Sequence, residues 1–115
     1  MDDFREKLKG KMDDYAHLVY KLTKEFPKEE IYGVTSQIRR SFLSVVLNYV
    51  EGFARGRRAV KQNFWQMAYG SLAESKYLLE FSFKENLITE KDYKSAIQLA
   101  EEIGAMLYRS LKTIS

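Results

Sequence analysis

Arginine side chains are the feature of this sequence with the clearest chemistry. Arg55, Arg57 and Arg58 lie in one RGRR run, and Lys61 follows within a helical turn. Guanidinium groups bind phosphate oxygens through paired, charge-assisted hydrogen bonds. Aromatic residues follow within eight positions of Lys61, and aromatic rings can stack on unpaired bases. The run predicts a nucleic-acid site, for RNA or DNA. In a single copy of the chain, the alternative is an ordinary solvated turn.

Charge along the chain is uneven, which adds to this prediction. The net charge is only +3, but residues 31–80 carry 7 basic and 3 acidic side chains, against 7 and 8 in residues 1–30. Such asymmetry is typical of a protein with an anionic partner. Arg39 and Arg40 contribute to the excess, yet they lie about four turns before Arg55 on one predicted helix. We expect them at the opposite end of that helix, as a separate patch or with a structural role.

A second group of polar residues lies among apolar neighbours. Asn48, Glu51 and Arg55 are spaced to share one helical face, and Glu74 lies in the middle of another predicted helix. Charge inside a bundle is costly unless it is paired. We interpret Asn48, Glu51 and Glu74 as a structural polar network, with one glutamate pairing with an arginine. The alternative is a site that presents Asn48 and Arg55 to a ligand.

Residues suited to catalysis or metal binding are few. His17 is the only histidine, and Asp13 is the carboxylate that precedes it by four positions. Two such residues are weak evidence for a metal site. Cysteine is absent, and so are the glycine-rich phosphate-binding motifs. We therefore expect no catalytic residue, no metal site and no cofactor, and we predict that the protein is not an enzyme.

Apolar residues recur at steps of three and four, which is the period of a helix. These stripes predict helices over about residues 4–26, 35–54, 58–84 and 89–114. Four such helices with short connections pack most simply as an antiparallel up-down-up-down bundle. The predicted fold is all-α, a single four-helix bundle domain over residues 1–115. The second helix is apolar nearly all round, so we expect it at the centre of the domain or at a subunit contact.

Residues at the predicted helix ends support these boundaries. Pro27 is expected to stop the first helix. Thr35 or Ser36 is expected to cap the second helix by accepting a hydrogen bond from a backbone N–H. Asn86 suits a left-handed stop after the third helix, and Thr89 suits the cap of the fourth.

The composition also bears on the compartment. The first residues are charged and lack the apolar core of a secretory signal, and no apolar run is long enough for a membrane span. With no cysteine, the chain needs no oxidising compartment. We expect a cytoplasmic protein with no membrane association.

Two segments carry a resemblance to a known family: YGVTSQIRRSFLSVVLNYVEGFARG and FWQMAYGSLAESKYLL. They resemble the four-helix bundle family of 23S rRNA intervening-sequence proteins, whose members read like YGLTSQIRRA, then S-x-P-x-N-x-x-EG-x-x-R, then A-x-GSL-x-E. The matching positions are Tyr32, Gly33, residues 35–40, Ser44, Asn48, Glu51, Gly52, Arg55, residues 70–72 and Glu74. Where the family has a proline, this chain has Val46, so we expect a straighter second helix.

The resemblance implies a ring-shaped homopentamer of antiparallel bundles without an established enzymatic activity. It also implies similarity to the accessory variability proteins of diversity-generating retroelements, which are basic pentameric bundles that work with a reverse transcriptase and its RNA. No residue separates the two subgroups.

Three functional hypotheses follow. The leading one is a non-enzymatic oligomeric adaptor that binds nucleic acid, structured RNA in particular, as an accessory protein to a reverse transcriptase. The alternative is a protein–protein interaction scaffold of the intervening-sequence family without direct nucleic-acid binding. A small-molecule or catalytic bundle would need a polar pocket around Asn48, Glu51 and Glu74.

Overall fold

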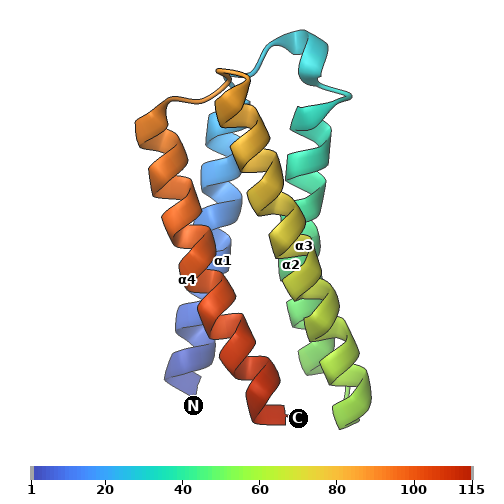
Figure 1. Cartoon of the computed structure of the whole chain (residues 1–115). Helices are drawn as coiled ribbons and strands as arrows, with labels where there is room; N and C mark the ends of the chain where they lie inside the picture. The colour runs from blue at the N-terminus through green and yellow to red at the C-terminus, as the bar shows by residue number, and fades with distance from the viewer. Residues whose placement is uncertain (1, 115) are drawn as a thin grey trace.

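The protein is built from four long helices (Figure 1). The structure is a computed structural model that describes residues 2–114, and no strand occurs among them. The helices are α1 (Asp2–Thr23), α2 (Val34–Ala54), α3 (Arg58–Lys84) and α4 (Glu90–Ile114), and a short 3-10 turn, η1 (Lys28–Glu30), lies between the first two. The all-helical prediction is confirmed.

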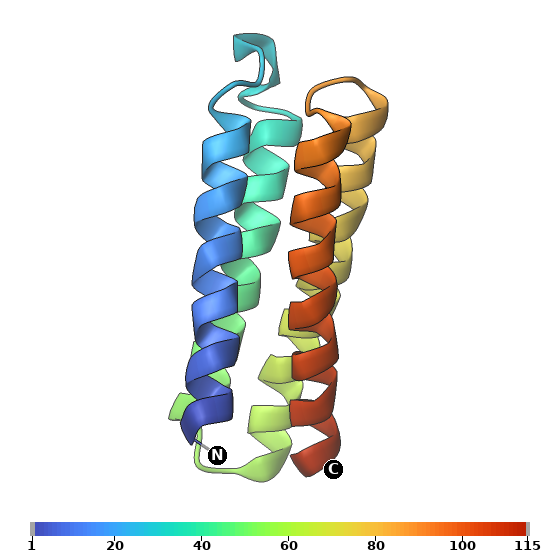
Figure 2. The same ribbon diagram turned by 90° about the vertical axis from the view of Figure 1, so that its left-hand side faces the viewer.

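The helices lie side by side and alternate in direction (Figure 2). Each contacts the next along the chain, and α1 also contacts α4, which closes the bundle. The α2–α3 connection and both ends of the chain lie at one end of the molecule, and the other two connections lie at the opposite end (Figures 1 and 2). Residues far apart in the sequence therefore meet at the end that carries the α2–α3 connection.

The core is formed by the apolar stripe of each helix, at the predicted period. Tyr15 and Phe42 meet edge to face near its middle, with ring centroids 4.1 Å apart. Tyr15 also exchanges a 2.8 Å hydrogen bond with the hydroxyl of Ser75. The other fully buried core residues include Leu8, Met12, Val19, Ile38, Val45, Ala68, Ala96, Ala100, Ile103 and Leu107.

Two of the predicted helix ends differ from the structure. The first helix ends at Thr23 rather than at residue 26, and Phe26 folds back as a buried residue after it. A residue before proline is disfavoured in the α conformation, so the chain leaves the helix before Pro27. The predicted cap of α2 is also wrong. Gly33 occupies the N-cap position without a side-chain bond, and the buried Thr35 hydroxyl has no partner within residues 2–114.

The predicted ends around the α3–α4 connection are confirmed. Asn86 adopts the left-handed conformation, with φ of 62°. The Thr89 hydroxyl accepts a 3.1 Å hydrogen bond from the backbone N–H of Asp92. Short polar side chains favour both positions because they bond readily to nearby backbone groups.

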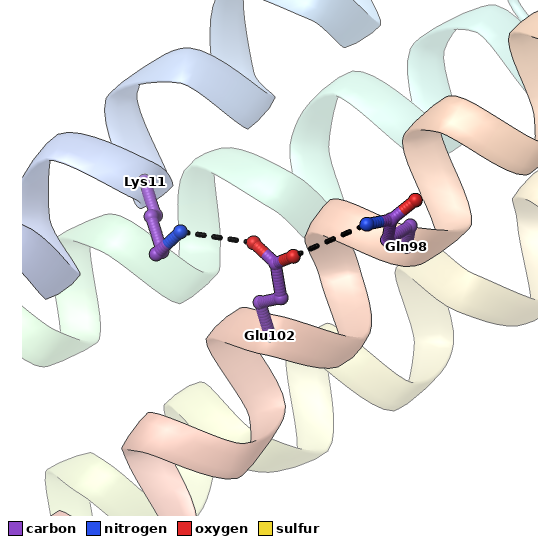
Figure 3. Close-up of polar contacts among 3 residues, drawn as sticks. All are labelled: Lys11, Gln98 and Glu102. Carbon is purple, nitrogen blue, oxygen red and sulfur yellow. Dashed lines mark hydrogen bonds and ion pairs between the residues drawn. The ribbon is translucent and has the colours of Figure 1, made fainter.

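A polar contact ties α1 to α4 across the closing edge of the bundle (Figure 3). Lys11 Nζ donates to Glu102 Oε1 at 2.9 Å, and Gln98 Nε2 donates to the other oxygen at 3.4 Å. The hydrogen bond and the charge of Lys11 lower the pKa of the Glu102 carboxyl below its ordinary value. Because this carboxylate is solvent-exposed, the contact fixes the alignment of the two helices more than it adds stability.

Candidate nucleic-acid interface

The predicted basic run forms the tight connection between α2 and α3. Arg55 and Arg57 both have extended backbones, with φ of −93° and ψ near 133°, and Gly56 lies between them. Arg55, Arg57 and Arg58 are exposed, and Lys61 is half-buried one turn into α3. The structure thus brings these four predicted residues together at one end of the bundle.

The arginines of this connection differ in their partners. Arg55 forms an ion pair with Glu51 one turn earlier, and its guanidinium lies 5.3 Å from the ring centroid of Phe64. Arg57 and Arg58 form no ion pair within the described chain. They therefore keep their donors available for a bound anion.

The start of α3 adds to the positive potential there. A helix N-terminus carries partial positive charge, so acidic residues usually occupy its first turn. The first turn of α3 holds no acidic residue and begins with Arg58. No side chain in the first turn of α3 therefore neutralises the positive charge at this helix end, and a bound anion would do so.

Three cations that sequence reasoning missed belong to the same end. Arg5 lies in the first turns of α1, and Arg109 and Lys112 lie in the last turns of α4. The termini and the α2–α3 connection share this end in both views (Figures 1 and 2). We define the basic end as these three residues with Arg55, Arg57, Arg58 and Lys61. The predicted up-down-up-down order contained this signal, because in such a bundle the start of the first helix and the end of the fourth lie beside the connection between the second and third.

Arg39 and Arg40 lie at the opposite end of α2, as their spacing indicated. Arg39 Nε donates to Thr23 Oγ1 at 2.8 Å, and its guanidinium covers the ring of Tyr20 at 4.5 Å. Both partners belong to α1, so Arg39 joins two helices. Arg40 is exposed and remains outside the basic end. The structure therefore separates both residues from the RGRR run, at the other end of α2.

The predicted pairing of a glutamate with an arginine is confirmed for Glu51 and Arg55, but Asn48 and Glu74 do not join them in one network. Asn48 Nδ2 donates to the carbonyl and hydroxyl oxygens of Ser44 at 2.8 and 3.0 Å. Glu51 pairs with Arg55 on its own helix, whereas Glu74 is exposed on α3. The bond that joins the two helices here runs instead between the hydroxyls of Ser44 and Ser71, at 2.9 Å. These two small side chains provide a polar contact between α2 and α3 in the middle of both helices.

The single histidine and the polarity of the helices bear on metal binding and membrane insertion. His17 is exposed, and Asp13 pairs with Lys9 at 3.3 Å. No group of three histidine or acidic side chains within residues 2–114 is placed to hold a metal ion. Within the same residues, no helix contains an apolar stretch long enough to cross a bilayer.

The fold and the basic end together define a small antiparallel helical bundle protein with a cationic pole. The family model of the 23S rRNA-intervening sequence proteins matches residues 7–109, so the chain belongs to that family.

A solved structure supports the fold assignment. The chain is similar to a protein of unknown function from the S23 ribosomal protein family of Bacteroides thetaiotaomicron, with a TM-score of 0.85 and 26% identity over 91% of this chain and 98% of that one. No curated protein matches the chain.

Proposed function

We propose that the protein is a non-enzymatic adaptor that self-associates and binds nucleic acid, structured RNA in particular, at its basic end. The observation that carries the proposal is the pair Arg57 and Arg58, which have no ion-pair partner within residues 2–114 and lie at the positive end of α3. Phosphate groups are the natural ligand of guanidinium groups in such a field.

Self-association is supported by an apolar strip on the outer face of α2. Leu43, Leu47 and Val50 are 40%, 67% and 46% exposed, and Met67 on α3 is 53% exposed. Such a strip is typical of a protein–protein contact. A second copy of the chain is the proposed occupant, and the ring-shaped homopentamer implied by the resemblance is the proposed assembly. Repeating the basic end around a ring would convert modest affinities into strong binding.

Light scattering tests the assembly. A pentamer has five times the chain mass of 13.5 kDa, and Leu47→Glu is expected to reduce the measured mass to that of a single chain. The matched control is Tyr32→Glu, which changes a side chain that is 95% exposed and lies outside the strip. A wild-type mass of one chain at micromolar concentration would contradict self-association.

Binding to RNA is tested by removing the basic run. The variant R55A/R57A/R58A is expected to lose most RNA retention and keep its helicity. The matched control, K24A/K28A/R40A, removes the same charge from exposed residues at the other end of the bundle. Removing one cation that neutralises a phosphate should reduce the slope of log affinity against log salt by about 0.7–0.9. The slope for the basic-run variant should therefore fall by about two units. Equal reductions in both variants would refute a specific basic end.

The partner proposed for the adaptor is a reverse transcriptase with its RNA, on the basis of the resemblance to the accessory variability proteins. The apolar strip also favours a second candidate, a protein scaffold without direct nucleic-acid binding. Co-purification of a protein partner that survives nuclease treatment and the basic-run substitutions would favour the scaffold.

A further inference from the structure

A cavity of about 450 Å³ opens at the basic end, between the ends of all four helices. Its apolar lining includes four aromatic residues: Phe4 from α1, Tyr49 and Phe53 from α2, and Trp65 from α3. Cavities of this size are typical of small-molecule sites. It was not predicted from the sequence, because its walls come from segments up to 110 positions apart.

The aromatic wall is well ordered by its own contacts. Tyr49 and Trp65 are stacked with ring centroids 5.3 Å apart. The ring of Phe53 makes a T-shaped contact with each of them, at a centroid distance of 5.0 Å. Trp65 Nε1 donates to the backbone carbonyl of Tyr49 at 3.1 Å. These contacts hold flat apolar surfaces in place before any ligand arrives, which lowers the entropic cost of binding.

Three cations surround this wall. Arg5 Cζ lies 4.1 Å from the ring centroid of Phe53, Lys61 Nζ lies 5.5 Å from the same ring, and Arg109 Cζ lies 5.4 Å from the centroid of Phe4. Among the described residues, none that lines the cavity carries a carboxylate. Among the described lining residues, the cavity therefore combines aromatic side chains with cationic ones, which fits a ligand that is both aromatic and anionic.

An unpaired hydroxyl belongs to a residue of the same wall but is itself buried from solvent. Tyr49 is 2% exposed, and its hydroxyl has no hydrogen-bond partner within residues 2–114. The other hydroxyls of the lining, on Ser110 and Thr113, donate to carbonyls of their own helix. A buried hydroxyl without a partner is costly, so Tyr49 contributes its ring to the wall at some expense of stability.

We propose that this cavity binds one unpaired nucleotide, with its base against the half-buried ring of Phe53, which covers the buried Trp65, and its phosphate among Arg5, Lys61 and Arg109. The inference rests on the proposed function and gives it a ligand: a single-stranded loop or end, since bases within a duplex are inaccessible to stacking. Lys61 follows Arg57 and Arg58 by about one helical turn, so the phosphates next to the bound nucleotide meet the basic run.

Fluorescence provides a direct test, because Trp65 is the only tryptophan of the chain. A base stacked on Phe53, whose ring centroid lies 5.0 Å from that of Trp65, should quench the Trp65 emission. Three ligands are compared with the wild-type protein: a single-stranded oligoadenylate, an abasic oligonucleotide of the same length and charge, and a duplex. The oligoadenylate is expected to quench Trp65 and to bind about tenfold more tightly than the abasic strand, from one stacked base. The duplex is expected to bind without quenching.

The outcomes separate this inference from the proposed function. Equal binding of the oligoadenylate and the abasic strand, without quenching, would overturn the cavity site and leave the basic end intact as a phosphate-binding surface. Failure of all three ligands to bind would overturn both. Equal quenching by free adenosine monophosphate would identify the source as a free nucleotide rather than a strand. Displacement of the nucleotide by dodecanoate at equal concentration would show a general site for apolar anions and refute nucleotide selectivity.

A matched pair of variants adds an independent measurement. Phe53→Leu keeps an apolar side chain but removes the flat face, and it should reduce oligoadenylate affinity about tenfold while leaving abasic binding unchanged. Phe81→Leu is the control, on a 40% exposed ring near the far end of α3. If Phe53→Leu fails to fold by circular dichroism, the wild-type comparison with the abasic strand still decides the inference.

Discussion

Two buried tyrosines offer a test of the unpaired hydroxyl behind the cavity wall. Tyr15 and Tyr49 are 0% and 2% exposed, but only the Tyr15 hydroxyl has a partner within the described residues, Ser75 at 2.8 Å. Replacing Tyr15 by phenylalanine leaves the Ser75 hydroxyl buried without a bond, which costs about 1–3 kcal/mol of the free energy of unfolding. Replacing Tyr49 by phenylalanine removes a hydroxyl that already lacks a bond, so we expect no loss or a gain of about 1 kcal/mol.

The expected difference between the two variants is therefore about 1–4 kcal/mol, with a central value of about 2 kcal/mol. For a domain of this length, that corresponds to about 8 °C in Tm. Thermal and urea unfolding followed by circular dichroism measure it. All variants must be compared at one protein concentration, because the proposed self-association would stabilise the folded state. Equal destabilisation by both substitutions would show that the Tyr49 hydroxyl has a partner in the folded protein, and the argument from it would fail.

The same tyrosines predict how stability depends on alkaline pH. Burial raises the pKa of Tyr49 to about 12, against a smaller opposite effect of Arg5, and burial raises the pKa of Tyr15 further still. The unfolded chain releases these protons near pH 10, so their contribution to stability is complete below that pH. It is lost as the pH rises through the folded-state values. Urea midpoints between pH 9 and pH 12 should fall less steeply in Tyr49→Phe than in the wild type, and parallel curves would contradict the assignment.

Three further predictions concern the framework that holds the site. Gly52→Ala places a methyl group onto the indole of Trp65, so we expect a loss of about 2 kcal/mol in urea unfolding and a shifted emission spectrum; an unchanged spectrum would argue against this packing. The lowered pKa of Glu102 means that its ion pair with Lys11 stabilises the fold above the ordinary glutamate pKa, and this stabilisation disappears as the pH falls through the folded-state value. Lys11→Met should flatten the dependence of the urea midpoint on pH between pH 3 and pH 6, and a curve unchanged from the wild type would refute that linkage. Arg39→Ala should cost about 1–2 kcal/mol in stability and leave RNA affinity unchanged, whereas weakened RNA binding with normal stability would return Arg39 to the interface.

Much of the fold could be predicted because its causes are local. A helix requires only an apolar residue every three or four positions and suitable residues at its ends. Asn86 and Thr89 were predicted correctly because each acts on backbone groups within a few residues. Thr35 was assigned the wrong role, since its hydroxyl is buried in the bundle and Gly33 takes the N-cap position.

The polar residues show where such reasoning stops. Glu51 and Glu74 look alike in the sequence, because both lie among apolar neighbours. In the structure Glu51 is half-buried against Arg55, while Glu74 is exposed. The rotation of each helix about its own axis decides this difference. That rotation is set by packing with the other helices rather than by neighbours along the chain.

The basic run, the four helices and the family resemblance were all determined by the sequence itself, because charge, period and motif are properties of neighbouring positions. Only the tertiary structure decided that Arg5 and Arg109 join Lys61 around one aromatic cavity, and that Arg39 does not. The physical reason is the closure of the bundle. Antiparallel packing brings the first turn of α1 and the last turn of α4 to the end where α2 meets α3, so the site is assembled from segments that no local pattern connects.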